Sequence, residues 1–179
     1  MEENPGTSNR IKKIAIVGPE STGKSDLARA LARYHKTVWV PEYARRYIDN
    51  LNRPYEKYDL FKIAIGQIQA EDQQEQKADE FLFCDTNLWV IKIWSEHKYG
   101  DCTEWILEEL KNRVYDLHLL TNNDLPWEED PQREHPALRE HFYDVYKNEL
   151  EAAGVDYKII SGTGNDRIEN AISAIETFL

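Results

Sequence analysis

Residues 18–25 read GPESTGKS and fit the pattern G-x-x-x-x-G-K-[ST] of loops that bind nucleotide phosphates. Glycines let such a loop curl, so that successive backbone N–H groups point at a phosphate, and the lysine reaches the β- and γ-phosphate oxygens. The serine hydroxyl ligates Mg²⁺. The segment therefore predicts a site for ATP and Mg²⁺, with Lys24 among the catalytic residues. The predicted nucleotide-binding residues here are Gly18, Ser21, Thr22, Gly23, Lys24, Ser25 and Asp26.

An acidic residue, Glu20, lies inside this loop, although the loop would hold phosphate anions. Backbone N–H groups, Lys24 and Mg²⁺ would bind the phosphates, so an intervening side chain can point away from them. A carboxylate repelled by phosphates would favour the acceptor side. There it would accept a hydrogen bond from a sugar hydroxyl or from an arginine such as Arg45. We therefore expect Glu20 to bind the substrate.

Asp85 ends the apolar run FLFCD. An acid at the end of a strand next to the phosphate loop suits the carboxylate on the Mg²⁺ side of a nucleotide hydrolase or kinase. Asp85 is accordingly a candidate both for catalysis and, with Ser25, for binding Mg²⁺. The alternative is that Asp85 caps the following helix, since the residues of Asp-Thr-Asn all favour that position.

A second acid, Glu42, follows a predicted strand in the segment VWVPEYARRY. At that rim a carboxylate can accept the proton of an acceptor hydroxyl as general base. Arg45 and Arg46 would bind a substrate phosphate or pair with Glu42, and Trp39 and Tyr43 would contact the substrate. The alternative interpretation is the start of a helix, with an acid in its first turn and bases after it.

The long irregular segment 121–136 contains TNNDLPWEEDPQREH and is expected to form a lid. Phosphoryl transfer needs cations that close on the γ-phosphate as charge develops, and a mobile loop with arginines supplies them while it excludes water. Arg133 is the first catalytic candidate. Arg139 is the second cation and is grouped with the nucleotide-binding residues, and Trp127 is a surface on which a flat ring would stack. The alternative is a solvated charged loop.

The segment SGTGNDR near the end of the chain follows another predicted strand. In phosphate-loop kinases such a loop often contacts the adenine, so Gly162 and Arg167 are further candidates for nucleotide binding. The competing interpretation is a turn and a helix start, with Asn165 or Asp166 as the cap. His135 and His141 do not have the helical spacing of metal ligands, so we expect no Zn²⁺ site.

Short apolar runs and the amphipathic patterns between them predict the elements that must position these residues. Runs without strict alternation are typical of strands buried on both faces of a parallel sheet, and alternation of strand with helix indicates an α/β fold. The predicted strands are 13–17, 37–40, 81–84, 117–120 and 157–160. The predicted helices are 24–35, 58–79, 88–99, 103–114, 136–153 and 165–178.

The length of 179 residues fits one domain, which we place at 11–179 after a flexible leader, residues 1–10. The net charge of −11 disfavours a nucleic acid as the main ligand, and a small anionic ligand remains compatible with a local cluster of donors. We expect no signal peptide, membrane span or disulfide, with Cys84 a buried free thiol, and therefore a cytoplasmic protein.

The segments GPESTGKS, WVPEYAR, FCDTNLWVIKIWSEHKYG and DLPWEEDPQREHP together resemble the nicotinamide riboside kinase domain of bacterial NadR-type proteins. The resemblance covers nearly the whole chain from about Ile11. It implies a P-loop NTPase fold of the nucleoside and nucleotide kinase type, with ATP and Mg²⁺ as cofactors. It also implies transfer of the γ-phosphate to the 5′-hydroxyl of nicotinamide riboside, a small-molecule substrate, which gives the mononucleotide.

By position, the resemblance makes Lys24 and Ser25 the phosphate and Mg²⁺ ligands, Asp85 the acid at the strand end and Arg133 part of the lid. It leaves open whether Glu42 or Asp85 is the base. The H-x-G-H type motif of the adenylyltransferase domain in NadR does not occur here, so adenylyl transfer and DNA-binding repression are not predicted. The alternatives are a kinase for another nucleoside or nucleotide, and a non-catalytic module that binds ATP for regulation.

Overall fold

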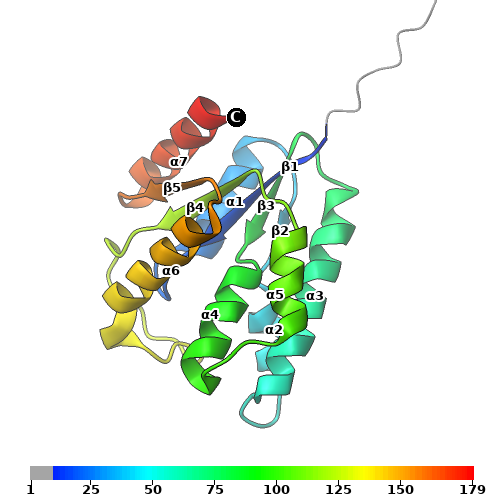
Figure 1. Cartoon of the computed structure of the whole chain (residues 1–179). Helices are drawn as coiled ribbons and strands as arrows, with labels where there is room; N and C mark the ends of the chain where they lie inside the picture. The colour runs from blue at the N-terminus through cyan, green and yellow to red at the C-terminus, as the bar shows by residue number, and fades with distance from the viewer. Residues whose placement is uncertain (1–9) are drawn as a thin grey trace, which may run out of the picture.

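A computed structural model describes residues 10–179, in which five parallel strands form one sheet in the order β2-β3-β1-β4-β5 (Figure 1). The predicted leader, residues 1–10, lies outside this range except for Arg10. All five predicted strands are present, with bounds shifted by at most a few residues. They are β1 (Lys12–Val17), β2 (Trp39–Val40), β3 (Phe81–Asp85), β4 (Leu117–Thr121) and β5 (Tyr157–Ile160). The five-stranded parallel sheet is therefore confirmed.

The strand β1 lies in the middle of this sheet, between β3 and β4. Its residue Ile14 is in register with Phe83 of β3 and with Leu117 of β4. Because neighbouring strands are parallel, their carboxyl ends meet at one edge. That edge carries the phosphate loop after β1, Asp85 at the end of β3 and the lid after β4.

Helices connect the strands and cover both faces of the sheet (Figure 1). Two details differ from the predicted helices. The segment after β2 forms a short helix immediately after Glu42, as the alternative interpretation of that segment had it, and the predicted helix 136–153 begins with a 3₁₀ turn. The helices are α1 (Lys24–Tyr34), α2 (Tyr43–Asp49), α3 (Lys57–Glu75), α4 (Leu88–Tyr99), α5 (Glu104–Asn112), η1 (Pro136–Leu138), α6 (Arg139–Ala153) and α7 (Gly164–Phe178).

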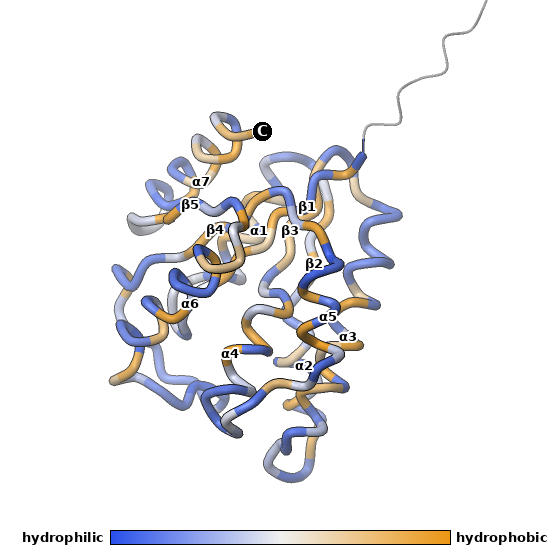
Figure 2. Tube along the Cα trace, viewed as in Figure 1, coloured by the Kyte–Doolittle hydropathy of each residue, from blue (hydrophilic) through white to orange (hydrophobic). Residues whose placement is uncertain are grey.

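Side chains of β1 alternate between two hydrophobic cores, one on each face of the sheet. Ile14 and Ile16 pack with residues of α1 and α7, whereas Ala15 and Val17 pack with residues of α4 and α6. The strands β3 and β4 are buried along their whole length, which explains their continuous apolar sequences (Figure 2). This packing fixes the strand ends that hold the site.

Both cysteines are free, and Cys84 is fully buried in β3, as expected. Among the described residues, each helix is too short or too polar to cross a membrane.

Candidate active site

The phosphate loop connects β1 to α1 through backbone angles that few side chains allow. Gly18 has φ 140° and Gly23 has φ 74°. A Cβ atom on Gly18 would lie 2.4 Å from the Thr121 side chain, so the loop can pass β4 at this distance only with glycine at that position. The loop then enters α1 at Lys24, where the first N–H groups of the helix have no partner within the helix.

A cavity of about 350 Å³ opens over this loop. The phosphate loop forms one wall, α2, α4 and α6 form others, and the lid, residues 121–136, closes the remaining side. The lining residues are Gly18, Pro19, Glu20, Ser21, Thr22, Gly23, Lys24, Ser25, Asp26, Glu42, Arg45, Val90, Trp94, Leu125, Pro126, Glu128, Gln132, Arg133, His135, Phe142 and Tyr146.

The ammonium of Lys24 lies at the floor of this cavity, where its Nζ donates to the carbonyl of Pro19 over 2.6 Å. Burial lowers the pKa of Lys24, while the carboxylates of Glu42, Asp85 and Glu20 act in the opposite direction. A cation among three acids suits a site that receives a polyphosphate with a metal ion.

The carboxylate of Asp85 is 2 % exposed and lies beside the Ser25 hydroxyl. Burial raises its pKa, whereas the hydrogen bond with Ser25 and the charge of Lys24 lower it. Its Oδ1 is buried and has no hydrogen-bond partner among the described residues. A buried oxygen of this kind beside a hydroxyl fits Mg²⁺, which takes one or two protein ligands and completes its shell with phosphates and water. The alternative role of Asp85 as a helix cap falls to Asn87, whose side chain accepts from the N–H of Trp89.

Glu42 lies between β2 and the first residue of α2. This position is at the end of a strand, as the general-base interpretation requires, and at the start of a helix, as the alternative interpretation requires. Burial, together with the charge of Asp85, raises the pKa of Glu42 to about 7, against the opposing effect of Lys24 and Arg45. A carboxyl group with such a pKa is suited to accept a proton near neutral pH.

Two of the predicted arginines reach the cavity. Arg45 on α2 forms an ion pair with Asp130 of the lid over 2.8 Å. Arg133 of the lid donates to the Ser21 hydroxyl over 3.3 Å and to the carbonyl of Glu128. The lid therefore brings the guanidinium of Arg133 to the phosphate loop.

Glu20 lines the cavity, but its hydrogen-bond donors differ from those expected. Its carboxylate accepts the backbone N–H groups of Glu134 and His135 in the lid, at 3.1–3.3 Å. Arg45, which was one of the two kinds of donor considered for Glu20, pairs with Asp130 instead. The carboxylate points away from the phosphate-binding backbone, as predicted, and toward the lid.

Four residues predicted to bind substrate do not line the cavity. Trp39 packs on the core beside α1, with the Arg29 guanidinium 5.7 Å from its ring. The ring of Tyr43 packs on Gly66 of α3 and carries the guanidinium of Arg46 at 5.1 Å. Trp127 belongs to the lid and has Arg139 6.0 Å from its ring. These residues are close to the motifs in the sequence, which is why we expected them at the site. In the structure their side chains point elsewhere and do not line the cavity.

Arg139 and Arg167, predicted at the nucleotide, brace the phosphate loop from outside the cavity. Arg139 donates to the carbonyls of Ser21 and Leu125 at 3.0 and 2.9 Å. Arg167 is 4 % exposed and donates to the carbonyl of Thr22 at 2.8 Å.

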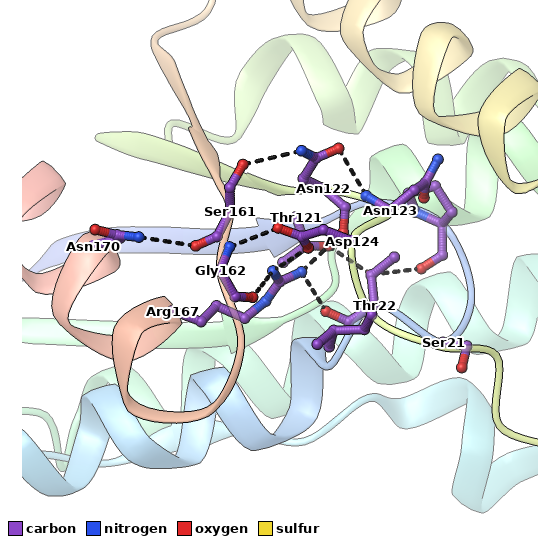
Figure 3. A network of polar contacts seen from close by, with 12 residues as sticks. Ser21, Thr22, Thr121, Asn122, Asn123, Asp124, Ser161, Gly162, Arg167 and Asn170 are labelled. Atoms are coloured by element: carbon purple, nitrogen blue, oxygen red, sulfur yellow. Dashed lines mark hydrogen bonds and ion pairs between the residues drawn. The ribbon is translucent and has the colours of Figure 1, made fainter.

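Figure 3 shows the rest of this network. Arg167 also donates to the carbonyls of Asn122 and Gly162 and to the carboxylate of Asp124, at 2.7–2.9 Å. The N–H of Gly162 donates to the same carboxylate over 2.6 Å. The loops after β4 and β5 are thereby tied to the phosphate loop, which gives Gly162 and Arg167 a structural role.

An apolar wall of the cavity was not among the sequence candidates. It consists of Val90 and Trp94 on α4 and of Phe142 and Tyr146 on α6. Within each pair the residues are four apart, so they lie on one helix face. That spacing is a signal in the sequence, but it does not distinguish a cavity wall from a core face.

This fold, with the phosphate loop, the acid on the neighbouring strand and the arginine lid, defines a P-loop protein of the nucleoside and nucleotide kinase type. The chain belongs to a family described as AAA domain (AAA_28), whose model matches residues 13–167. It is 30% identical over 129 residues to "Trifunctional NAD biosynthesis/regulator protein NadR" of Salmonella typhimurium, covering 69% of this chain and 31% of that protein. It is 28% identical over 155 residues to the Escherichia coli protein of the same description, covering 82% of this chain and 37% of the relative. The chain thus spans about a third of the length of these relatives, and the resemblance to NadR-type proteins is confirmed.

Solved structures show the same fold. A crystal structure of NadR protein in complex with NR superposes with a TM-score of 0.75 at 23% identity, covering 94% of this chain and 52% of that one. Thymidylate kinase from Ehrlichia chaffeensis has a TM-score of 0.62 at 14% identity, covering 94% of this chain and 98% of that one. Deoxyadenosine kinase from M. mycoides has a TM-score of 0.55 at 13% identity, covering 92% and 99%. At these identities the likeness establishes the fold.

Proposed function

We propose that the protein is an ATP-dependent kinase that phosphorylates the 5′-hydroxyl of nicotinamide riboside to give nicotinamide mononucleotide. The observation that carries the proposal is the placement of Glu42, with a pKa raised to about 7, in one cavity with Lys24 of the phosphate loop. A general base and a phosphate-binding lysine in one cavity are what transfer from ATP to a hydroxyl requires.

The donor side consists of the phosphate loop, Ser25 and Asp85. Backbone N–H groups of the loop and the Lys24 ammonium bind the triphosphate. Ser25 and the buried Oδ1 of Asp85 would hold Mg²⁺. When bound, the ion neutralises charge on the β- and γ-phosphate oxygens.

The acceptor side begins at Glu42. Its ionised carboxylate accepts the proton of the attacking 5′-hydroxyl as the bond from that oxygen to the γ-phosphorus forms and the bond to the β-γ bridging oxygen breaks. Glu42 is preferred to Asp85 as base, because Glu42 lines the cavity, whereas Asp85 lies beside Ser25, where Mg²⁺ would be held. The apolar wall of Val90, Trp94, Phe142 and Tyr146 offers a surface for a flat ring.

The lid completes the site with Arg133. Its guanidinium lies next to the Ser21 hydroxyl, and therefore at the end of the loop where a γ-phosphate would lie. There it would stabilise the charge that develops on the transferred group. Residues of the lid also line the cavity, so the lid would limit the access of water to the reacting phosphate.

The choice of nicotinamide riboside rests on the two NadR relatives and on the NadR structure with NR. A kinase for another nucleoside or nucleotide is the second candidate, favoured by the likeness to deoxyadenosine kinase and thymidylate kinase. A non-catalytic ATP-binding module is the third alternative, and it would have no use for a carboxyl group whose pKa is raised toward 7.

A coupled ADP-release assay tests the proposal. The purified chain receives Mg²⁺ and ATP with nicotinamide riboside, with uridine or deoxyadenosine, with thymidylate, or with no acceptor. We expect ADP release and nicotinamide mononucleotide only with nicotinamide riboside, and loss of both in Glu42→Gln. ADP release with another acceptor but not with nicotinamide riboside would overturn the assignment of the substrate. ADP release that is equal with and without every acceptor would overturn the proposed kinase reaction.

A further inference from the structure

We propose that Glu20 is a positioning residue, which holds Arg133 over the phosphate loop by binding the lid backbone next to it. The proposal rests on the kinase reaction above, in which Arg133 acts on the transferred phosphate. Glu20 accepts from the N–H of Glu134 at 3.2 and 3.3 Å and from the N–H of His135 at 3.1 Å. These are the two peptide groups that follow Arg133 in the chain.

The type of contact fits a positioning role. Both carboxylate oxygens of Glu20 take part, and hydrogen bonds to an ionised acceptor are stronger than those between neutral groups. The donors are backbone groups, so the contact fixes the path of the chain and is independent of the side chains at positions 134 and 135. A fixed backbone on the carboxyl side of Arg133 limits the volume that its guanidinium can reach.

The neighbouring residue of the phosphate loop, Ser21, holds the other end of the same lid segment. Its hydroxyl accepts the N–H of Glu128 over 2.8 Å and contacts the guanidinium of Arg133 at 3.3 Å. Ser21 has φ 57°, a left-handed backbone conformation that is uncommon outside glycine. Glu20 and Ser21 thus bind the lid on either side of Arg133, so the loop that binds the phosphates also places the lid arginine.

These contacts account for an acid within a phosphate-binding loop. The negative charge of Glu20 acts on the lid. It also acts on Lys24, where it raises the pKa and so favours the protonated, positively charged form. Both oxygens of Glu20 already accept lid N–H groups, so a substrate hydroxyl would have to share the carboxylate with the lid. A role through Arg133 therefore agrees better with the contacts than the substrate-binding role expected from the sequence.

The first test measures the lid without relying on catalysis. Amide hydrogen exchange is compared for the protein, Glu20→Ala, Glu20→Gln and the control Glu129→Ala, which removes an exposed lid carboxylate. We expect faster exchange at residues 134 and 135 in Glu20→Ala, a smaller increase in Glu20→Gln, which keeps one carbonyl acceptor, and no change in the control. Unchanged exchange in Glu20→Ala overturns the contact.

The second test separates an action through Arg133 from direct binding of the acceptor. Glu20→Ala is expected to lower kcat by about 10- to 100-fold, at most the loss from removing a transition-state donor such as Arg133, with the KM for ATP little changed. The double variant Glu20→Ala/Arg133→Ala is expected to be no slower than Arg133→Ala alone, because residues that act as one unit are not additive. Losses that multiply, or a higher KM for the acceptor with kcat unchanged, overturn the positioning role.

Failure of the proposed function gives a different result from failure of this inference. If the protein transfers phosphate to no acceptor, the proposed kinase reaction is wrong, and there is no longer a catalytic reason for Glu20 to position Arg133. The exchange experiment would then still decide whether Glu20 binds the lid. A protein that turns over and whose kcat and lid exchange are both insensitive to Glu20→Ala retains the function and loses the inference.

Discussion

The guanidinium of Arg45 on α2 donates to the carboxylate of Asp130 in the lid over 2.8 Å. The N–H of Gln132 donates to the same carboxylate over 2.9 Å. These hydrogen bonds hold the pKa of Asp130 below its ordinary value. Because α2 begins immediately after Glu42, this pair joins the helix that follows the proposed base to the segment that carries Arg133.

Breaking the pair should therefore affect substrate binding more than folding. In Asp130→Asn we expect a rise of about 3- to 10-fold in the KM for the acceptor and a change in unfolding free energy below about 1 kcal/mol, since Arg45 is 42% exposed. Steady-state kinetics and urea unfolding measure the two quantities, with Glu129→Gln as the matched control. An unchanged KM for the acceptor in Asp130→Asn would contradict a role of the pair in substrate binding.

The depressed pKa of Asp130 also sets the pH range of this stabilisation. The pair stabilises the folded state fully above the ordinary pKa of an aspartate, and the stabilisation is lost as the pH falls through the lower pKa of Asp130 in the folded state.

The pKa of Glu42, raised to about 7, predicts a pH profile for turnover. The base must be ionised, so kcat should rise as the pH increases through about 7 and level off above it. Glu42→Gln should lower kcat by about 10²- to 10⁴-fold. The measurement is kcat from pH 5.5 to 9 with saturating substrates. A flat profile, or a variant with normal kcat, would transfer the role of base to another group.

The same pKa predicts how folding depends on pH. A carboxyl group whose pKa is raised by folding binds its proton more tightly in the folded state, so its effect on stability becomes less favourable as the pH rises from 4.5 toward 7. Glu42→Gln removes this effect. Urea unfolding at pH 5 and pH 8 should show that the variant gains stability relative to the unmodified protein at the higher pH. An equal difference at both pH values would contradict the raised pKa.

Lys24 provides a test of the phosphate loop. Lys24→Ala should abolish ATP-dependent turnover, because the Nζ group lies at the cavity floor where the β- and γ-phosphates would bind. Folding should be retained, since burial lowers the pKa of Lys24 and its removal relieves a desolvated charge. ADP release and thermal unfolding are the measurements, and Lys111→Ala on the exposed side of α5 is the control. Normal turnover in Lys24→Ala would exclude the loop from catalysis.

The structure gives Arg167 a role in stability. Arg167→Met would remove the guanidinium that donates to the carboxylate of Asp124 and to the carbonyl of Thr22, and Asp124 would keep the N–H of Gly162 as a donor. We expect a loss of about 2–4 kcal/mol in unfolding free energy, as is usual when one partner of a buried network is removed. Urea unfolding measures it, with exposed Arg33→Met as the control. A loss no larger than in the control, with a large rise in the KM for ATP, would restore the nucleotide-binding role expected from the sequence.

Local patterns in the sequence predicted the strands, the phosphate loop and Asp85. Each depends on a short segment: an apolar run, a glycine pattern, or an acid directly after a buried strand. The order of the strands then brings Asp85 beside Ser25 without further information. For such features, sequence neighbours determine most of the geometry.

The direction of side chains beyond those segments was not predictable in the same way. Trp39 and Tyr43 are close to Glu42 in the chain, but the alternation of β2 and the docking of α2 on α3 direct them elsewhere. The contact of Glu20 with residues 134 and 135 joins segments more than a hundred positions apart. It depends on the path of the lid, which no periodic pattern encodes.

The docking of α2 on α3 predicts an effect of Gly66, which does not line the cavity. A Cβ atom at Gly66 would lie 2.1 Å from the ring of Tyr43, and the N–H of Tyr43 donates to Gln67 over 3.1 Å. Replacing glycine by alanine inside a helix ordinarily stabilises by about 1 kcal/mol. Here Gly66→Ala must displace Tyr43, and with it the adjacent Glu42. We therefore expect a protein that is destabilised and a kcat lowered by about 10-fold or more, as small misplacements of reacting groups produce.

The second variant for this prediction removes the clashing ring. Gly66→Ala/Tyr43→Ala should recover part of the kcat lost in Gly66→Ala, because the new methyl group then meets no ring, whereas Gln69→Ala on the exposed side of α3 should leave kcat unchanged. Kinetics at several pH values add a readout that general destabilisation would not move. If α2 shifts, the midpoint near pH 7 assigned to Glu42 should move with it, since the burial that raises this pKa depends on where α2 begins. A stable, fully active Gly66→Ala would show that the position of Glu42 does not depend on this contact.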